Sequence, residues 1–399
     1  MPIQLVNRRY RQLRRYREIV EVFLRHGFGY LIEQLDLHHI LPLRRRVLPV
    51  ERPQRPTSRG ARLRQALEEL GPTFVKLGQL LSTRADIVPR DILAELEHLQ
   101  DDVSEVPFPQ IRQQLEAELG RPLSEAFREF DPAPLAAASI GQVHRAVLHS
   151  GEEVAVKVQR PGIEEIIAVD LEILQSLAGL VEERFQPDFV RPRELVDQFA
   201  RTLRAEMDYE LEARNMEGFR RRFQHAPKIR VPRVYWDLTT HRVLTMDFVR
   251  GVKISDIQEL DRLGVDRREL AVRGARVFLE QVLIHGVFHG DPHPGNLFVE
   301  ADGTLAVVDF GMVGRLDEEA LANIADLFIG VMNRDADRLV QALIRIGAVE
   351  GTVNRRGLKM DMEDLIDRHY GKPLHKLEVG QIISEAFELT RRHRIRMPS

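Results

Sequence analysis

Residues 289–296, with the sequence HGDPHPGN, contain two side chains of the kinds that bind magnesium. They are Asp291 and Asn296, which lie five positions apart. Two prolines and a glycine between them disfavour a helix, so we expect a stiff loop that directs both side chains toward one point. Thirteen residues after Asn296, Asp309 begins the triplet Asp-Phe-Gly. Carboxylate and amide oxygens in this pattern are suited to holding Mg²⁺ against a phosphorylated ligand.

The order of these residues, D-x-x-x-x-N followed by D-F-G, is that of the catalytic half of a protein kinase. A nucleotide triphosphate is densely charged, and divalent metal neutralises that charge during phosphoryl transfer. We therefore predict that Asp309 is the main metal ligand and Asn296 the second. Asp291 is predicted to orient or deprotonate the attacking hydroxyl group or water. The predicted cofactors are ATP or ADP and Mg²⁺.

A lysine at the end of an apolar strand, VAVK, completes the predicted nucleotide site. Lysine is scarce in this chain, at 7 of 58 basic residues, and Lys157 is predicted to reach the α- and β-phosphates. A buried cation needs an anionic partner. We predict a helix over 203–215 whose Glu212 is that partner, with Glu206 as the second choice. Asp208 and Glu212 are four residues apart and are expected to share one face of this helix.

The phosphate loop of a protein kinase is rich in glycine, whereas the corresponding loop of this chain is rich in alanine. It consists of Ala136, Ala137, Ala138 and Ser139. Alanine does not adopt positive φ without strain, so this loop is not expected to wrap phosphates as a glycine loop does. The departure argues against ordinary protein phosphorylation. The adenine ring is predicted to contact a hinge over 246–249, through Asp247 and Val249.

The hydrophobic patterns around these residues indicate the elements that position them. Helices are predicted over 1–45, 61–82, 90–100, 109–119, 163–185, 193–222 and 267–286, with a linker over 47–60. Strands are predicted over 140–148, 153–159, 229–236 and 242–249, with a short hairpin over 297–299 and 305–308. Helices first, then strands around one long helix, then a mostly helical half, indicate an α+β fold. This order disfavours a dinucleotide-binding doubly wound sheet.

The composition limits the class of protein and the kinds of site. The 399 residues suffice for one two-lobed domain or two ordinary ones. The absence of cysteine excludes disulfides, cysteine-bound zinc, iron–sulfur clusters and thiol nucleophiles, and it fits a reducing cytoplasm. No apolar run approaches the roughly 18 residues of a membrane span. The arginines near the N-terminus leave no apolar core for a signal peptide.

The first 64 residues are strongly basic. They contain 15 arginines against five acidic residues, a balance of +10 in a chain whose net charge is −3. This asymmetry predicts an anionic partner. An anionic membrane surface fits the amphipathic pattern better than nucleic acid does, because no stacking aromatic residues or known module accompany the arginines. We therefore expect no nucleic acid partner and a cytoplasmic protein lying peripherally at the inner membrane face. A merely solvated arginine-rich helix is the alternative.

Several segments resemble the UbiB/AarF family of atypical kinase-like proteins. They are the HGDPHPGN loop, the AAAS loop, VAVKVQRPG, EMDYELEARN and GPTFVKLGQLLSTRADIVP. The resemblance extends from about residue 60 to about residue 395 and implies a protein-kinase-like fold with an N-terminal helical extension. In this family the KxGQ helix packs over the active site. That implies a regulatory position for Lys76 and Gln79 near Glu206 and Asp208.

The resemblance also implies a role in ubiquinone or other isoprenoid lipid metabolism, with ATP binding and hydrolysis favoured over protein phosphorylation. The implied partners are nucleotide and an isoprenoid lipid. We assign residues 1–60 to a basic helical segment and linker, 61–126 to the family-specific helical extension, 127–250 to a kinase-like N-lobe with inserted helices, and 251–399 to a helical C-lobe. Family members normally continue through further helices, so the C-lobe is predicted to be truncated.

Three alternatives remain open. The HGDPHPGN loop also resembles small-molecule phosphotransferases of the aminoglycoside-kinase type, although the KxGQ helix and the alanine loop do not. A pseudokinase that binds nucleotide without turnover is the second. The third is a metal hydrolase in which His289, Asp291 and His293 bind zinc or iron. The kinase-like interpretation explains the same loop in full.

Overall fold

The computed structural model describes residues 2–37, 58–84, 87–99, 104–185, 191–349, 354–369, 379–393 and 395–396. The chain divides into two compact units. The helical unit is drawn from residues 1–100, 168–199 and 317–399, and the sheet unit from residues 101–167 and 200–316. The four segments proposed from the sequence, with boundaries at 60, 126 and 250, stay predictions.

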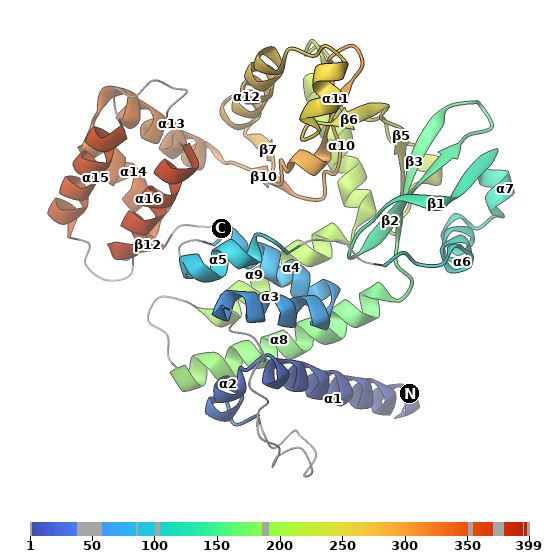
Figure 1. Ribbon diagram of the computed structural model, residues 1–399, viewed down its shortest axis with the longest axis horizontal. Coiled ribbons are helices and arrows are strands. Elements are labelled where there is room, and N and C mark those ends of the chain that lie inside the picture. Colours follow the sequence, from blue (N-terminus) through green and yellow to red (C-terminus); the bar gives the residue numbers. More distant parts are fainter. Residues whose placement is uncertain are drawn as a thin grey trace. The chain divides into compact units, whose positions relative to one another are not determined.

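The helical unit contains two groups of helices, together with most of α8 (Ile163–Phe185) and the first part of α9 (Pro192–Glu206). The first group is α1 (Pro2–Arg25), α2 (Gly29–Gln34), α3 (Arg59–Leu70), α4 (Pro72–Ser82) and α5 (Arg90–Leu96). The second is α13 (Glu318–Asn333), α14 (Ala336–Ile346), α15 (Arg355–His369) and α16 (Val379–Arg392), with a short pairing of β11 (Ala348–Val349) with β12 (Ile395–Arg396). Figure 1 shows α13, α14, α15 and α16 side by side as a bundle. Their shared core includes Leu339, Leu343, Leu358 and Met362.

The N-terminal helix prediction needs two adjustments. Gly27, at φ 81°, separates α1 from α2, because glycine adopts this left-handed conformation without strain. The predicted linker ends earlier than residue 60, since the Ser58 hydroxyl accepts a hydrogen bond from the Ala61 backbone (3.0 Å) and caps α3. Residues 38–45 and 47–57 lie outside the described residues. The predicted break between α3 and α4 is present at Gly71.

The sheet unit is built on a four-stranded antiparallel sheet of order β1-β2-β3-β5. Its strands are β1 (Glu129–Ala137), β2 (Gly141–Val147), β3 (Glu153–Gln159) and β5 (Val243–Asp247). Side chains of a strand alternate between the two faces of a sheet. Val154, Val156 and Val158 therefore pack in one core with α6 (Phe108–Leu119) and α7 (Leu123–Ala126). Ala155 packs in a second core on the other face, to which Lys157 also points.

The predicted helix over 193–222 is wrong as a single element. It is two helices, α9 (Pro192–Glu206) and α10 (Tyr209–Phe223), and both follow α8 (Ile163–Phe185). Asp208 adopts an extended conformation between them, and its carboxylate accepts a hydrogen bond from the Leu211 backbone (3.0 Å). An aspartate in this position caps a new helix. Asp208 and Glu212 consequently do not share a helix face as predicted, because Asp208 precedes the first turn of α10.

The rest of the sheet unit surrounds the predicted hairpin, which is present. A second sheet has the order β4-β9-β8-β6, and β7 pairs with β10. These strands are β4 (Ile229–Arg230), β6 (Gly251–Lys253), β7 (Val287–His289), β8 (Leu297–Glu300), β9 (Leu305–Val307) and β10 (Val313–Arg315), with helices α11 (Ile257–Arg262) and α12 (Arg267–Leu283). The predicted strand over 229–236 was too long, since it shortens to β4, one bridge from Val234 to Met246 and a 3₁₀ turn, η3 (Trp236–Leu238).

None of the helices in the described residues has both the length and the apolar character that spanning a bilayer requires.

Candidate functional site

Lys157 and Glu212 form the centre of the candidate site. Lys157 lies in β3, and its ammonium group donates to both carboxylate oxygens of Glu212, at 3.1 and 2.9 Å. Glu212 lies one turn into α10 and its side chain is 1% exposed, whereas that of Lys157 is 17% exposed. Of the two predicted partners of Lys157, Glu212 makes this bond. The strand β3 thus carries the cation, and α10 carries the buried anion that pairs with it.

Asp309 brings a second carboxylate to the same lysine. Its Oδ2 lies 3.6 Å from the Lys157 ammonium nitrogen, and its side chain is 45% exposed. The backbone of Asp309 has φ 62°, a left-handed conformation that few residues other than glycine adopt. The turn is held by a hydrogen bond from the Gly311 backbone to Asp309 Oδ1 (3.2 Å). Strained backbone of this kind occurs at ligand-binding positions, where the surrounding structure compensates for it.

The side chains around Lys157 carry more negative than positive charge. Although burial alone would lower the pKa of Lys157, the carboxylates of Asp309 and Glu212 raise it well above its usual value. Burial raises the pKa of Glu212 to about 7, with Lys157 opposing the rise and Asp309 and Glu206 reinforcing it. One ammonium therefore serves several carboxylates. An additional cation at this point would relieve their repulsion.

Tyr209 is a site residue that the sequence analysis did not single out. The Lys157 ammonium lies 5.0 Å from the centre of its ring, which is a cation–π contact. The tyrosine is 1% exposed, and burial raises the pKa of its hydroxyl. It lies three residues before Glu212 and hence on the same face of α10. The sequence feature that could have identified Tyr209 is an aromatic residue three positions before Glu212 within the EMDYELEARN segment.

Asn215 is the second residue that was missed. Its amide donates to the backbone carbonyl of Phe310 (3.0 Å), so α10 holds the segment that follows Asp309. Phe310 is 1% exposed and its ring lies 4.9 Å from that of Phe219 and 5.0 Å from that of His289. Asn215 is also three residues beyond Glu212. One face of α10 therefore contacts both Lys157 and the Asp-Phe-Gly segment.

The loop with Asp291 and Asn296 is tied internally and to the strand before Asp309. The Asn296 amide donates to the Asp291 carbonyl (3.3 Å), and the Val308 backbone donates to the Asn296 carbonyl (2.9 Å). Asp291 is exposed. The expectation that the loop would contain no helix was wrong by one turn, because Pro294–Asn296 form a 3₁₀ turn, η4. Proline is tolerated there, since the first position of a helix needs no backbone donor.

The two histidines of this loop support its backbone. His289 Nδ1 accepts from the Asp291 backbone (3.2 Å), and His293 Nδ1 accepts from the Gly295 backbone (3.0 Å). Within the described part of the chain, no group of three histidine or acidic side chains could hold a metal ion. The metal-hydrolase alternative built on His289, Asp291 and His293 therefore lacks the cluster that it requires.

The predicted alanine loop is shorter than expected. Ala136 and Ala137 belong to β1 and pair with Val143 and Gln142, so only Ala138 and Ser139 lie in the turn. Ser139 is fully buried. The turn is held by the guanidinium group of Arg160, which donates to the Ala138 carbonyl (2.9 Å). Just beyond the turn, a Cβ on Gly141 would lie only 2.5 Å from the Tyr209 hydroxyl oxygen.

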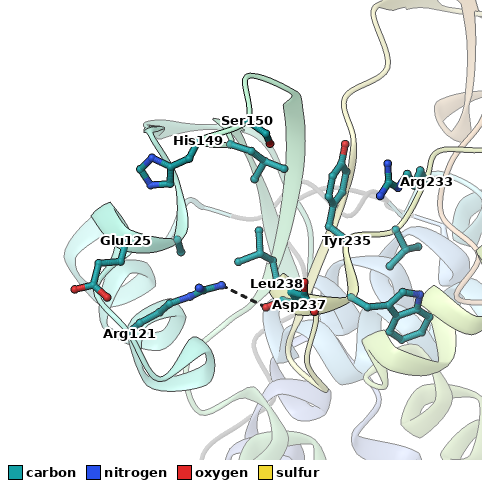
Figure 2. Close-up of a pocket in the computed structure, with 12 residues that line it drawn as sticks. Arg121, Glu125, His149, Ser150, Arg233, Tyr235, Asp237 and Leu238 are labelled. Carbon is teal, nitrogen blue, oxygen red and sulfur yellow. Dashed lines mark hydrogen bonds between the residues drawn. The ribbon is translucent and has the colours of Figure 1, made fainter.

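The predicted hinge lies at the end of β5. The carboxylate of Asp247 accepts from the Tyr235 hydroxyl (2.9 Å) and from the Arg233 backbone (3.1 Å). Figure 2 shows Arg233 beside the Tyr235 ring, and their separation of 5.1 Å is a cation–π contact. The Asp247 side chain thus fastens the neighbouring segment to β5. Because the Asp247 carboxylate is already bonded, Asp247 would have to contact a nucleotide through its backbone. Nucleotide binding by Asp247 and Val249 stays a prediction.

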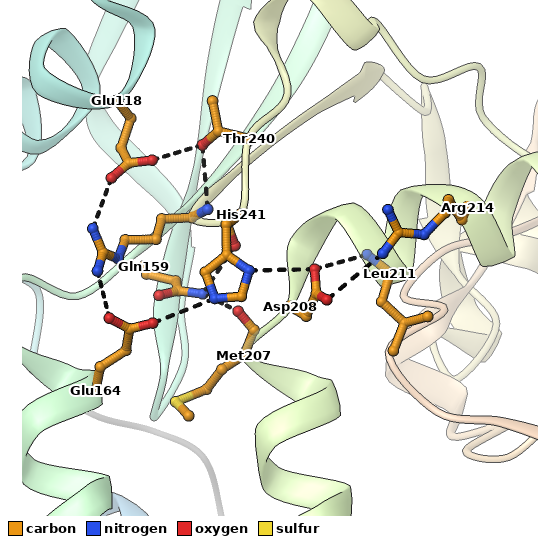
Figure 3. Close-up of polar contacts among 10 residues, drawn as sticks. Glu118, Gln159, Glu164, Met207, Asp208, Leu211, Arg214, Thr240 and His241 are labelled. Atoms are coloured by element: carbon orange, nitrogen blue, oxygen red, sulfur yellow. Dashed lines mark hydrogen bonds and ion pairs between the residues drawn. The ribbon is translucent and has the colours of Figure 1, made fainter.

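Asp208 is part of a polar network at the junction of α9 and α10 (Figure 3). The His241 ring lies between two carboxylates, with Nδ1 3.4 Å from Asp208 and Nε2 3.3 Å from Glu164. Arg242 joins Glu164 to Glu118 in α6, at 2.9 Å from the latter. The turn before β5 is thereby fixed to the start of α10, the helix that supplies Glu212.

Glu206 and the KxGQ residues, Lys76 and Gln79, are the remaining predicted site residues. Glu206 ends α9, and its charge contributes to the raised pKa of Glu212, so it lies close enough to act on the Lys157 cluster. Lys76 and Gln79 lie in α4 of the helical unit, where Gln79 donates to the Leu99 carbonyl (3.4 Å). Their predicted position near Glu206 and Asp208 stays a prediction.

Comparison with known proteins adds family evidence to this geometry. A model of the ABC1 atypical kinase-like domain matches residues 98–343, and a model of the UbiB helical domain matches residues 362–399. The probable protein kinase UbiB of Marinobacter nauticus is 39% identical over 345 residues, which cover 85% of this chain and 63% of that protein. Protein ACTIVITY OF BC1 COMPLEX KINASE 7, chloroplastic, of Arabidopsis thaliana is 39% identical over 341 residues, which cover 84% and 49%.

The chain thus spans about half to two thirds of the length of these curated relatives. Among solved structures, Mycobacterium tuberculosis Rv3197 in complex with erythromycin is similar in fold. Its TM-score is 0.55 and its sequence identity 24%, over 82% of this chain and 90% of that one. The family match and this likeness together confirm the predicted α+β fold of the protein-kinase-like type.

Proposed function

Because the chain belongs to the ABC1 atypical kinase-like family, as its resemblance to UbiB/AarF proteins predicted, we propose that it binds ATP or ADP with Mg²⁺ and transfers or hydrolyses the terminal phosphoryl group. The observation that supports this most directly is the Lys157 cluster. A buried glutamate holds the lysine through both oxygens, and Asp309 approaches the same ammonium to 3.6 Å. A lysine fixed in this way is positioned to bind phosphate oxygens.

The residues present fit a bound magnesium ion. The excess of carboxylates around Lys157 and the raised pKa of Glu212 indicate a place where a cation is favourable. Carboxylate and amide oxygens are also the ligands that Mg²⁺ prefers. When bound, Mg²⁺ would be held by Asp309 and Asn296 and would neutralise charge on the phosphates.

The chain's own groups have distinct roles in this proposal. Lys157 contacts the α- and β-phosphates, and Glu212 and Tyr209 keep its ammonium group in place. Asp291, which is exposed at the start of its loop, orients or deprotonates the attacking hydroxyl group or water. The alanine turn that precedes Gly141 is held by Arg160 and does not wrap the phosphates as glycine would. This difference favours ATP hydrolysis or a small acceptor over a protein substrate.

Thermal unfolding with Mg²⁺ and ADP or ATP tests the nucleotide site. Mg-nucleotide should raise the Tm of the wild-type protein and leave that of Asp309→Asn unchanged, because the variant loses the carboxylate that binds metal. Asp302→Asn is a matched control, since Asp302 pairs with Lys228 on the surface (2.7 Å) and not with Lys157. No stabilisation of the wild type by any Mg-nucleotide would contradict the proposal.

Phosphate release in the same samples separates the alternatives. Release that is lost in Asp291→Asn supports an ATPase or kinase. Nucleotide binding that survives Asp291→Asn, with no release by the wild type, would identify a pseudokinase. A phosphorylated metabolite among the products would instead support a small-molecule phosphotransferase.

We also propose that the protein acts on ubiquinone or isoprenoid lipid metabolism at an anionic membrane surface. The supporting observation is α1, where Tyr10 is 71% exposed and Leu13 52% exposed. Arg14, one turn beyond Tyr10, is exposed on the same face. Exposed apolar and basic groups together favour the interface of an anionic bilayer. Lys76 and Gln79 would then regulate access to the nucleotide site from the helical extension.

Vesicle cosedimentation tests this surface. The protein should bind vesicles containing phosphatidylglycerol at low salt and bind those of phosphatidylcholine weakly. Arg14→Gln and Leu13→Ser should each reduce binding, whereas Arg268→Gln in the exposed first turn of α12 should not. Equal binding to both vesicle types would contradict an electrostatic membrane contact.

A further inference from the structure

The turn before β5 contains a histidine whose ring contacts two carboxylates at once. The His241 ring has Nδ1 3.4 Å from Oδ1 of Asp208 and Nε2 3.3 Å from Oε1 of Glu164. Figure 3 shows the ring between these two side chains, one at the start of α10 and the other in α8. The histidine side chain is 49% exposed, so protons from solvent reach it. Each ring nitrogen therefore faces a hydrogen-bond acceptor.

Only the charged form of the ring can make both contacts as hydrogen bonds. An ionised carboxylate only accepts hydrogen bonds, a neutral imidazole carries one N–H, and an imidazolium carries two. A neutral His241 ring could donate to Asp208 or to Glu164, and would turn a lone pair toward the other carboxylate. Histidine is the side chain that ordinarily changes its charge between about pH 5 and pH 8. The link between these two carboxylates is thus complete only while the ring is protonated.

His241 is also part of a row of charges that alternate in sign from α6 to α10. This charge row consists of Glu118, Arg242, Glu164, His241, Asp208 and Arg214. The hydrogen bond from Arg242 lowers the pKa of Glu164, and the His241 ring adds to this effect. With the ring charged, the cations of the row balance its anions. Loss of the ring proton leaves an excess of negative charge where Asp208 and Glu164 approach the ring.

The backbone of the same histidine is bonded to both elements that meet at the Lys157 site. The His241 carbonyl accepts from the Tyr209 backbone (3.1 Å) and from the Gln159 side chain (3.3 Å). Gln159 is the last residue of β3, two residues beyond Lys157, and Tyr209 is the first residue of α10. The ring in turn contacts Asp208, the residue that caps α10. A shift of this turn would therefore reach the helix face that holds Lys157.

We propose that protonated His241 is a positioning residue for the Lys157 site. The imidazolium joins Asp208 to Glu164 and so fixes the first turn of α10, from which Tyr209 contacts Lys157. When the ring loses its proton, one of the two contacts is lost and the start of α10 is held less firmly. The effect on nucleotide affinity rests on the proposed function, whereas the pH-dependent link between α8 and α10 does not.

Double-mutant cycles in urea unfolding measure the link without nucleotide. One cycle combines His241→Gln with Asp208→Asn, which keeps the helix cap because asparagine also caps. The other combines His241→Gln with Glu164→Gln. At about pH 6 each coupling should change the unfolding equilibrium constant by about twofold to fivefold, as expected for partly exposed ion pairs. At about pH 8 at least one of the two couplings should disappear, because a neutral ring donates to one carboxylate.

The matched control is a cycle of Arg242→Gln with Glu118→Gln. This ion pair, at 2.9 Å, belongs to the same charge row but contains no histidine. Its coupling should be the same at both pH values. Couplings of His241 that are absent at about pH 6, or that persist unchanged in both cycles at about pH 8, would overturn the proposal.

Calorimetry of Mg-ADP binding tests whether the link reaches Lys157. His241→Arg keeps a positive charge at both pH values, and its planar group can donate to two carboxylates. Between about pH 6 and pH 8 the wild type should lose about twofold to fivefold more affinity than His241→Arg, and His241→Gln should bind weakly at both. The titrations of ADP and of Glu212 are common to all three proteins and cancel in this comparison.

The two measurements separate failure of the link from failure of the nucleotide site. The same pH dependence of affinity in wild type and His241→Arg would overturn the positioning role of the ring. A wild type that binds no Mg-ADP would refute the nucleotide site, and the couplings measured without nucleotide would still decide the pH-dependent link.

Discussion

Protonation of Glu212 should make the stability of the nucleotide-free protein fall as pH rises. Burial raises the pKa of Glu212 from an ordinary 4.5 to about 7. Between these values the folded state holds a proton that the unfolded state has released. Stability falls with pH wherever the folded state binds more protons, so the free energy of unfolding should decline across this window. A rise of this size corresponds to at most about 3 kcal/mol.

Lys157 does not contribute to this slope. The carboxylates around it oppose the effect of burial and raise its pKa, so that it stays protonated in the folded state well beyond neutral pH. The stability that it provides is fully present below its unfolded pKa and is lost only in strongly alkaline solution. Of Lys157 and Glu212, only Glu212 therefore contributes to the fall in the free energy of unfolding between acidic and neutral pH.

Urea unfolding at about pH 4 and about pH 8, which bracket the window from 4.5 to about 7, measures the effect. Glu212→Gln keeps the size of the side chain but removes its titration. The wild type should lose up to about 3 kcal/mol more than this variant between the two pH values. Glu210→Gln is the matched control, because Glu210 lies on the same helix with a side chain that is 46% exposed. It should follow the wild type.

The same pH dependence of stability in wild type and Glu212→Gln would show that the titration of Glu212 is not the cause. A second arm uses saturating Mg²⁺ and ADP with the wild type. Because an added cation offsets the excess of carboxylates, Mg²⁺ and ADP should reduce the loss of stability at the higher pH. An unchanged loss would show that the ligand binds elsewhere.

Three further substitutions follow from the site, and a fourth, outside it, serves as a control. Asp309→Asn should keep the fold, since asparagine also tolerates φ 62°, and should raise the nucleotide-free Tm at neutral pH by removing a repelling carboxylate, as a thermal scan would show. Asn215→Ala removes the bond to the Phe310 carbonyl, which should cost about 1 kcal/mol in urea unfolding and weaken Mg-ADP binding in calorimetry. Gly141→Ala places a Cβ 2.5 Å from both the Tyr209 hydroxyl and the Val158 backbone carbonyl and should cost about 1–3 kcal/mol, whereas Gly274→Ala in α12 meets open space and should gain up to about 1 kcal/mol.

Each of these expectations has a result that contradicts it. A lower nucleotide-free Tm for Asp309→Asn would mean that its carboxylate stabilises the cluster. Normal stability and ADP affinity in Asn215→Ala would show that α10 does not hold the Asp-Phe-Gly segment. Equal effects of alanine at Gly141 and Gly274 would mean that the Tyr209 hydroxyl and the Val158 carbonyl both move aside without cost.

The sequence was sufficient to predict a carboxylate partner for Lys157 on a following helix and favoured Glu212, although Glu206 stayed the second choice until the structure showed the bond. An apolar strand that contains a lysine and a helix with a glutamate give such a pair, because a buried cation requires an anion. The strands β2 and β3 were also predictable, since their alternation is regular and a glycine turn joins them. Family membership and fold class followed from motifs distributed over most of the chain.

Other features depended on contacts that periodicity does not reveal. The apolar pattern runs through Asp208, yet the aspartate ends one helix and caps the next, because its side chain bonds the Leu211 backbone. Ala136 and Ala137 extend β1, since pairing with β2 outweighs the weak strand preference of alanine. The left-handed backbone of Asp309 has no signal in residue type alone.

The burial of Phe310 has a consequence for the populations of this protein's conformers. Moving its ring from contact with Phe219 and His289 into water would cost about 2–3 kcal/mol, and releasing Asn215 about 1 kcal/mol more. A difference of about 3–4 kcal/mol leaves a turned-out conformer below about one molecule in a hundred. A ligand that requires that conformer would bind at least about a hundredfold below its intrinsic affinity. Compounds that fit the inward conformer incur no such loss.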